Sequence, residues 1–363
     1  MLVEIGLISD ALWTDYDNDG WVDLLLAGEW MPLTLLKNSS GSFDQKITIG
    51  EEKAVGWWNS LASGDFDMDG DMDYVAGNLG SNSLIKTSWQ SPVSLYAGDY
   101  DNNEYLDLFP TTYYRDVSGD MKEYPYFGRT DTEKQLREFK KLYPTHKEFG
   151  MATMDEVMDK LPDATQLLLK ANYQLTSYIE NRGNGEFFVK ELPAEVQLAP
   201  VFAILTGDFT DDQLPDILIT GNDYGNEIAS GRYDAMNGLL LHGDGRGNFE
   251  PIPMQQSGII IPGDGKSLAK LQSSDSALVV LSGQNRGKLG MFKSANTYFT
   301  LSPEPDDHAA VIHLQDGRSY RQEIPYGNSY LSHSARRLWL PRNVSHVELI
   351  NYKGERRNLM VSE

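Results

Sequence analysis

The sequence predicts an all-β protein built as a β-propeller, with a helical insertion and a small C-terminal β-domain. Four segments align as repeats, each with an Asp-rich loop followed by an apolar, β-rich run: 14–30, 64–80, 98–114 and 207–223. Glycine-rich turns before an aromatic residue, typical of tight hairpins, follow at 37–43, 180–187 and 242–249. Tandem four-strand units of this kind are propeller blades, which hide sheet edges by radial repetition.

The blades are expected to fill residues 1–301. Segment 266–293 predicts a fifth blade without an Asp loop, because LVVLSG and LGMFK read as strands. Five units make a short propeller, and unpaired sheet edges would favour self-association of the chain. The opening residues, MLVEIGLISDALW, show no basic signal-peptide region. We therefore expect further blades and a signal or anchor upstream.

A charge-balanced helical insertion is predicted at about 129–172, within the third repeat. The segment 132–143 places Leu136, Phe139 and Tyr143 on one helical face. Thr153 and Glu156 form a capping box for a helix that ends soon after Lys160. A third helix is expected over 164–172. The insertion is either a lid or docking element, or a structural buttress.

Residues 302–363 follow a different pattern and predict a separate β-domain. A DG turn and a KG turn each lie between alternating apolar runs, which indicates two hairpins. The boundary is expected near Pro303 and Pro305.

The net charge of −22 is concentrated in the Asp-rich loops. These loops contain 17 acidic and no basic residues: 15–23 (loop one), 65–73 (loop two), 99–107 (loop three) and 208–216 (loop four). Carboxylates gathered this closely repel one another unless cations neutralise them. The same charge argues against a nucleic-acid partner, which requires a basic face. There is no cysteine, and no apolar run is long enough for a transmembrane helix.

The loops predict metal ligands at positions 1, 3, 5 and 9, with the backbone carbonyl of position 7 as a further ligand. Hard oxygen ligands at this spacing suit Ca²⁺. Three calcium sites and a weaker fourth are expected, the fourth departing from the pattern at Thr210. The ligands are Asp15, Asp17, Asp19, Trp21 and Asp23; Asp65, Asp67, Asp69, Asp71 and Asp73; Asp99, Asp101, Asn103, Tyr105 and Asp107; and Asp208, Thr210, Asp212, Leu214 and Asp216.

The Asp-rich loops have two other possible interpretations. An EF-hand needs a bidentate Glu at position 12, where this chain has Leu26, Ala76 or Pro110. Plain Asp-rich turns without metal remain the alternative. A structural calcium of weak affinity is useful only where calcium is plentiful, so we expect an exported protein that is periplasmic, outer-membrane-associated or at the cell surface.

Two polar-aromatic stretches are candidates for ligand binding. One contains Trp57 and Trp58, and the other contains Tyr224, Glu227, Arg232, Tyr233 and Asp234. Aromatic rings beside carboxylates and an arginine suit a sugar or a peptide. The alternative for the second stretch is an inter-blade loop held by an Arg–Asp pair. No nucleophile elbow and no HExxH motif occur.

The loops and hairpins resemble FG-GAP/VCBS repeats, known from integrin α-chain propellers and bacterial surface proteins. The resemblance covers about 12–300 and implies calcium in loops one to three. The tail LQDGRSYRQEIPYGNSYLSHSARRLWLP with VELINYKGERRNL looks like an ASPIC/UnbV domain, as in the cartilage-acidic-protein type. The helical insertion and the GRYDA stretch are similar to large exported proteins of Bacteroidetes-type bacteria.

The sequence therefore favours a calcium-stabilised binding or adhesion module whose ligand is a glycan or a protein. A polysaccharide-active, lyase-like enzyme on the same scaffold is the first alternative. A scaffold that docks a protein partner through the helical insertion is the second.

Overall fold

The computed structural model describes residues 2–226, 230–275, 277–327 and 329–360. Strands make up 46% of the chain and helices 10%, which confirms the predicted all-β class. The chain divides into two compact units. The blade unit comprises Met1–Glu52, Trp57–Asn82 and Leu175–Glu363, and the inserted unit comprises Lys53–Gly56 and Ser83–Gln174.

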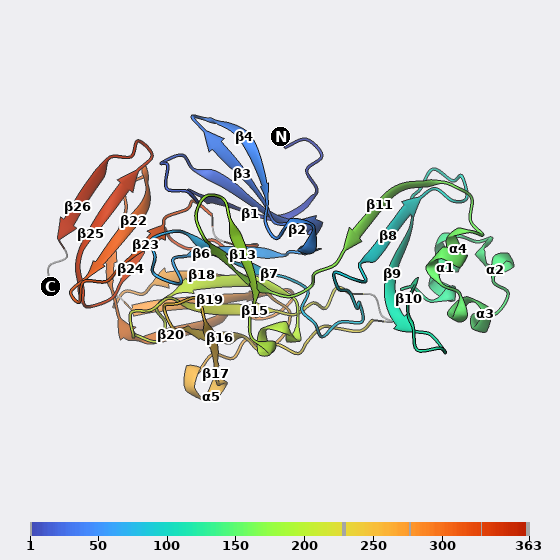
Figure 1. The fold of residues 1–363 in the computed structure, drawn as a ribbon. Coiled ribbons are helices and arrows are strands. Elements are labelled where there is room, and N and C mark those ends of the chain that lie inside the picture. The colour runs from blue at the N-terminus through green and yellow to red at the C-terminus, as the bar shows by residue number, and fades with distance from the viewer. Residues whose placement is uncertain (1, 227–229, 276, 328, 361–363) are drawn as a thin grey trace. The chain divides into compact units, whose positions relative to one another are not determined.

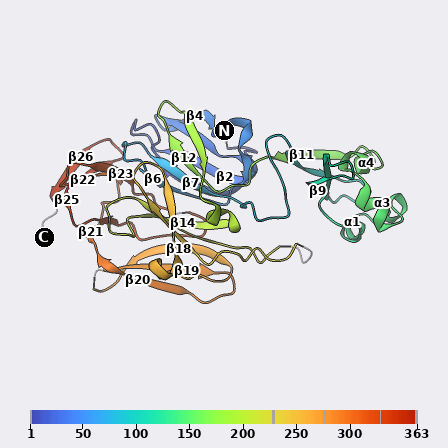
Figure 2. The ribbon, with the colours of Figure 1, turned by 60° about the horizontal axis from the view of Figure 1, so that its bottom comes forward.

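Four antiparallel sheets of the blade unit succeed one another along the chain (Figure 1). The first contains β1 (Leu7–Thr14), β2 (Asp23–Pro32), β3 (Thr34–Ser39) and β4 (Ser42–Thr48). The second contains β6 (Ser60–Gly64), β7 (Asp73–Gly77), β12 (Ser177–Asn181) and β13 (Phe187–Glu191). The third contains β14 (Val201–Gly207), β15 (Asp216–Gly221), β16 (Leu239–Gly243) and β17 (Phe249–Ile252). The fourth, orange in Figure 2, contains β18 (Gly265–Gln272), β19 (Ala277–Gln284) and β20 (Gly290–Thr297).

The first strand of each sheet lies beside that of the next, in the order β1, β6, β14, β18. This is the succession expected of neighbouring propeller blades. The second and third sheets share a core in which Phe66, Tyr178 and Phe249 meet edge to face, with ring centroids 5.4 to 5.9 Å apart. Such aromatic pairs stabilise a fold beyond the area that they bury.

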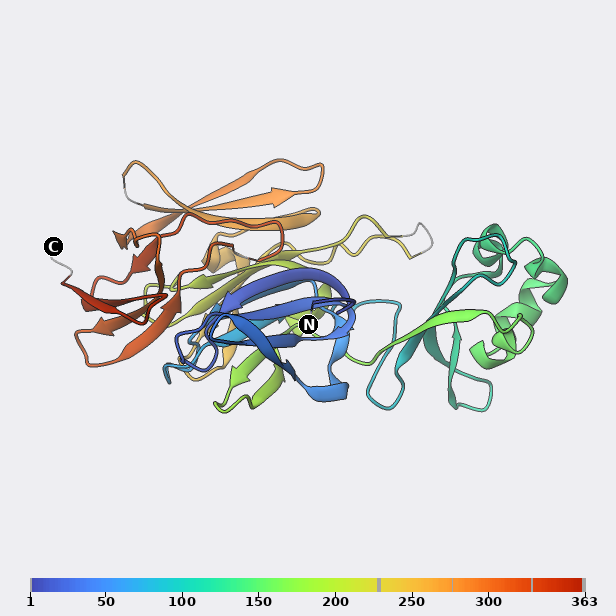
Figure 3. The same ribbon diagram turned by 90° about the horizontal axis from the view of Figure 1, so that it is seen from above.

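The inserted unit interrupts the second sheet between β7 and β12. Figure 3 shows its strands and helices in teal and green. Its sheet has the order β10-β9-β8-β11. The sequence predicted an insertion from about 129 within the third repeat, whereas this unit includes the third repeat itself. Its elements are β8 (Val93–Gly98), β9 (Asp107–Arg115), β10 (Met121–Pro125), α1 (Arg129–Gln135), α2 (Phe139–Leu142), α3 (His146–Met151), α4 (Met154–Met158) and β11 (Thr165–Ala171).

The helices of the inserted unit agree only in part with the sequence. Leu136, Phe139 and Tyr143 are buried together as predicted, but α1 ends before Leu136 and α2 begins at Phe139. The capping box of Thr153 and Glu156 is confirmed. The helix predicted over 164–172 is wrong, because this segment forms β11 and pairs antiparallel with β8. Pairing with a strand that is distant in sequence overrides the local helix propensity of its Leu, Gln and Lys residues.

The C-terminal strands form a sheet in the order β23-β22-β25-β26. Gly317 and Gly354, with φ of +90° and +75°, turn the two predicted hairpins, which are confirmed. The strands are β21 (Phe299–Leu301), β22 (Asp307–Leu314), β23 (Ser319–Glu323), β24 (Leu338–Leu340), β25 (Val344–Asn351) and β26 (Arg356–Met360), of which β21 pairs with β24.

Short connecting elements complete the fold. They are β5 (Val55–Trp57), α5 (Met254–Ser257) and two 3-10 helices, η1 (Glu51–Lys53) and η2 (Ala194–Leu198). Within the described residues, no helix has the length and apolar character needed to cross a membrane.

Candidate metal centres and a neighbouring pocket

All four Asp loops have one register and one backbone shape. In each loop the residue before position 1 pairs with the Asp at position 9: Thr14 with Asp23, Gly64 with Asp73, Gly98 with Asp107 and Gly207 with Asp216. Positions 4 and 6 have positive φ in every loop. Gly20 and Gly70 take up this conformation at position 6 without strain, whereas loop three has Glu104 there. The four repeats are therefore structurally equivalent.

The Asp at position 9 is buried and holds the loop backbone together. Its Oδ2 accepts a hydrogen bond from the position 2 amide at 3.3, 3.2, 3.2 and 2.8 Å in loops one to four. In loops one, two and four its Oδ1 also accepts from an amide of the third strand. Burial raises the pKa of Asp23 to about 7 and that of Asp73 to about 8. The sequence suggested position 9 only as a metal ligand, and the structure adds this bracing role.

The position 7 amide turns inward in every loop. It donates to the side-chain oxygen at position 5 over 2.8 to 3.0 Å, from Trp21, Asp71, Tyr105 and Leu214. This contact folds each loop around the side chains at positions 1, 3 and 5.

Carboxylates gather in loops one, two and three. In each cluster the oxygens of three side chains lie within 4.8 Å of one another: Asp15, Asp17 and Asp19; Asp65, Asp67 and Asp69; and Asp99, Asp101 and Asp107. Oδ1 of Asp15, Asp17 and Asp65 is buried and accepts no hydrogen bond from the described part of the chain. Burial raises the pKa of Asp65 to about 7. Buried, unsatisfied carboxylate oxygens in such a cluster fit a divalent cation with oxygen ligands.

Loop one already contacts two cationic side chains. Lys37 forms ion pairs with Asp17 and, at 2.9 Å, with Asp19. Arg321 from β23 donates to Asp15 Oδ2 at 3.0 Å. These contacts neutralise part of the charge that a metal ion would otherwise neutralise.

Strand β23 ties the C-terminal sheet to loops one and two. The Arg321 amide donates to Asp65 Oδ2 at 2.8 Å. The Glu323 carboxylate accepts from the Asp15 amide at 2.7 Å and from Thr14 Oγ1 at 2.9 Å. Both side chains are only 8% exposed. Sequence reasoning missed Arg321 and Glu323, because they lie between 256 and 308 residues from the loop residues they contact.

Loop four differs from the other three. Asp208 accepts from the amides of Asp211, Asp212 and Gln213, and Thr210 Oγ1 donates to Asp216 Oδ2 at 3.0 Å. The side chains whose ligand atoms lie within 4.8 Å of one another here are Asp212, Asp216 and His242. Sequence reasoning missed His242, although it is the first residue of the predicted hairpin 242–249 that follows this loop.

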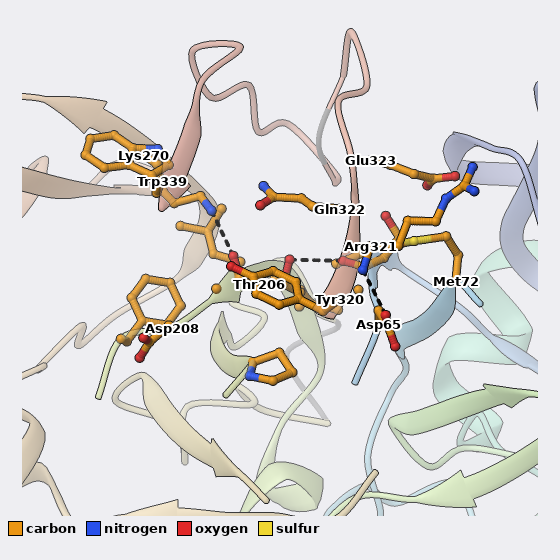
Figure 4. Close-up of a pocket in the computed structure, with 18 of the residues that line it drawn as sticks. Asp65, Met72, Thr206, Asp208, Lys270, Tyr320, Arg321, Gln322, Glu323 and Trp339 are labelled. Carbon is orange, nitrogen blue, oxygen red and sulfur yellow. Dashed lines mark hydrogen bonds between the residues drawn. The ribbon is translucent and has the colours of Figure 1, made fainter. Parts of the chain in front are cut away.

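A cavity of about 120 Å³ lies beside loops two and four, between the third sheet and β23 (Figure 4). Tyr298, Tyr320 and Trp339 contribute aromatic rings to its wall. The Lys270 ammonium donates to the Thr206 carbonyl at 2.8 Å. Burial lowers the pKa of Lys270 to about 8. The pocket thus combines aromatic surface with a cationic group.

The ligand candidates from the sequence lie elsewhere. Trp58 is fully buried and Trp57 packs against Trp30, so these rings belong to the interior. The backbones of Asp223 and Tyr233 pair, and the Arg232 guanidinium stacks on Tyr224 at 4.6 Å. Among the described residues, Arg232 forms no ion pair with an aspartate, so the suggested Arg–Asp pair is not observed there. Asp234 is exposed, and Glu227 lies outside the described residues.

Comparison with known proteins gives one family match. No curated protein matches this chain. The family model described as an FG-GAP-like repeat matches residues 15–76, which include loops one and two and the strands β2 to β7.

Proposed function

We propose that this chain is a calcium-braced binding module of an exported or surface protein, and that its ligand is an acidic glycan. The observation behind this proposal is the carboxylate cluster of loop two. Asp65 Oδ1 is buried without a hydrogen bond, and no ion pair from the described residues reaches Asp65, Asp67 or Asp69. The match to an FG-GAP-like repeat supports a surface or adhesion type of module.

Calcium suits these loops better than magnesium. Their side-chain donors at positions 1, 3 and 5 are oxygens on a tight loop, and Ca²⁺ accepts six to eight such ligands in flexible geometry, whereas Mg²⁺ requires a near-ideal octahedron. The ion would neutralise the carboxylates and couple its binding to folding. In loop one it must displace Lys37 from Asp17 and Asp19, so we expect loop two to bind more tightly.

The pocket supports an anionic sugar as ligand. Aromatic side chains such as Tyr320 and Trp339 offer apolar faces on which a sugar ring can stack. Lys270 forms no ion pair with any carboxylate in the described residues, and its ammonium donates to the Thr206 carbonyl. A partly buried ammonium without a counter-ion favours a ligand that carries a carboxylate or sulfate group.

Calcium should stabilise the protein against heat and denaturant. A site filled at ten times its dissociation constant adds about 1.4 kcal/mol, and Kd values near 10⁻⁴ M make millimolar calcium sufficient. Thermal and chemical unfolding of the full chain, in EDTA, calcium and magnesium, would measure this. Asp67→Asn should lose part of the gain, whereas Asp44→Asn, at an exposed position in β4, should keep it. An equal gain with magnesium, or an undiminished gain in Asp67→Asn, would argue against calcium in loop two.

Lys270→Met should weaken glycan binding by about 10- to 100-fold, the effect of losing one charge-assisted hydrogen bond. Calorimetry with oligogalacturonate in calcium would measure it, and a neutral oligosaccharide should bind weakly to the native protein. Lys288→Met is the matched control, because Lys288 is exposed and away from the pocket lining. Tight binding of a poly-glutamate peptide without glycan binding would instead identify a protein ligand.

A further inference from the structure

One position on the third strand of three blades faces each Asp loop. It lies directly opposite the Asp at position 9, as the strand register shows. In each sheet, the residue that follows the position 9 Asp pairs with a residue of the third strand: Leu24 with Leu36, Tyr74 with Ile179 and Ile217 with Leu241. Because the strands are antiparallel, the Asp itself lies opposite the next residue of the third strand. The next residue along the third strand is therefore equivalent in the three blades, and it is Lys37, Glu180 or His242.

The chemistry at this position differs from blade to blade. Lys37 neutralises Asp17 and Asp19 of loop one. Burial raises the pKa of Asp67 in loop two to about 6, and the charges of Asp69 and Glu180 add to that rise. His242 instead brings an imidazole nitrogen to loop four. The three loops therefore present different donor sets to a cation despite their common backbone.

Loop four also departs from the calcium pattern at position 3. Asp208, at position 1, accepts hydrogen bonds from three amides of its own loop, and Asp99 in loop three accepts from two. Thr210 replaces the carboxylate at position 3, and its hydroxyl is bound to Asp216. Loop one, in contrast, keeps unsatisfied oxygens on Asp15 and Asp17. At positions 1, 3, 5 and 9, loop four thus offers a calcium ion one carboxylate fewer than loop two does.

The imidazole of His242 is directed at the two remaining carboxylates. Its Nδ1 lies 3.5 Å from Asp212 Oδ2 and 3.4 Å from Asp216 Oδ1. Asp216 is fully buried, and Nδ1 is itself buried without a hydrogen bond to any described residue. We propose that Asp212, Asp216 and His242 form a site for a divalent transition metal such as Zn²⁺ or Co²⁺, separate from the calcium sites.

The donor set gives this site its metal preference. One imidazole and two carboxylates match the ligands of zinc and other first-row divalent ions, whereas calcium takes oxygen alone. Asp212 and His242 are each about one-third exposed, so an ion can enter from solvent and keep a water or an external ligand. The proposed site uses no residue of loops one to three. It therefore remains a candidate metal site even if those loops are plain turns that bind no calcium.

Titration of the EDTA-treated, dialysed full chain with Co²⁺ tests the proposal. The expected result is one ion bound with a visible absorption band from nitrogen and oxygen ligands, which zinc displaces and millimolar calcium does not. His242→Gln should bind Co²⁺ at least about tenfold more weakly, as expected when a ligand is lost. Its unfolding midpoint in EDTA should match that of the native protein, which shows that the fold is intact.

A second variant separates this site from other histidines. His313 and His346 stack with ring centroids 4.2 Å apart in the C-terminal sheet and could bind the same ion. His346→Gln should leave the Co²⁺ band and affinity unchanged. Three results would overturn the proposal: Co²⁺ binding by His242→Gln as tight as by the native protein, displacement of Co²⁺ by calcium, or the absence of a visible absorption band. In each case, Asp212, Asp216 and His242 form only an ion pair.

Discussion

Replacing Arg321 by methionine should lower the free energy of unfolding of the metal-free protein by about 3–5 kcal/mol, the range for removing one partner of a buried ion pair. The guanidinium lies 3.0 Å from Asp15 Oδ2, and both side chains are buried. Without it, Asp15 and its neighbour Glu323 remain as buried carboxylates with no cation beside them. Methionine keeps much of the volume of the arginine side chain. The loss of stability therefore reports the removal of the positive charge. Urea unfolding in EDTA would measure it.

Arg356→Met is the matched control for this change. Arg356 lies in the same C-terminal sheet and pairs with Glu348, but its side chain is 60% exposed, so its loss should cost less than about 1 kcal/mol. Saturating calcium should shrink the Arg321→Met effect, because an ion in loop one would neutralise Asp15. Equal effects of the two variants would show that β23 does not depend on Arg321.

The local part of this architecture could be predicted from the sequence. Each Asp loop is a contiguous segment of nine residues whose backbone is set by its own side chains, as the contact from Trp21 to Asp19 shows. The DG and KG hairpins are equally local. The clusters of Asp15 with Asp17 and of Asp65 with Asp67 were expected for the same reason, because their spacing alone brings the oxygens together.

The features of the fold that could not be predicted from the sequence depend on contacts between distant segments. The second sheet is completed only when β7 pairs with β12, about 100 residues later, so the repeat pattern could not show which sheet is interrupted. β11 was mistaken for a helix because its partner strand lies some 70 residues earlier. Arg321 reaches loop one from another sheet, and nothing near it in sequence marks that role, whereas His242 begins the predicted hairpin 242–249 and could have been found by comparing the repeats.

Without metal, stability should fall as the pH rises from about 6.5 to 8. Burial raises the pKa values of Asp23 and Asp65 to about 7 and that of Asp73 to about 8, from 3.8 for an ordinary carboxyl. The folded protein therefore binds more protons than the unfolded chain in this range, and the free energy of unfolding decreases with pH. One extra proton over 1.5 pH units corresponds to about 2 kcal/mol.

This pH window separates the carboxylates from two groups that act in the opposite direction. Burial lowers the pKa of His308 from 6.5 to about 4, so this group affects stability mainly below pH 6.5. Burial lowers the pKa of Lys270 from 10.5 to about 8, so this group affects stability mainly above pH 8. Urea unfolding at steps from pH 6.5 to 8 in EDTA would measure the slope, and Asp73→Asn should reduce it. Calcium should flatten the slope, because the ion holds carboxylates in their charged form and protons compete with it. A flat or rising stability in EDTA would mean that the loop carboxylates are already ionised in the folded protein, so that the loops need no cation to keep their shape.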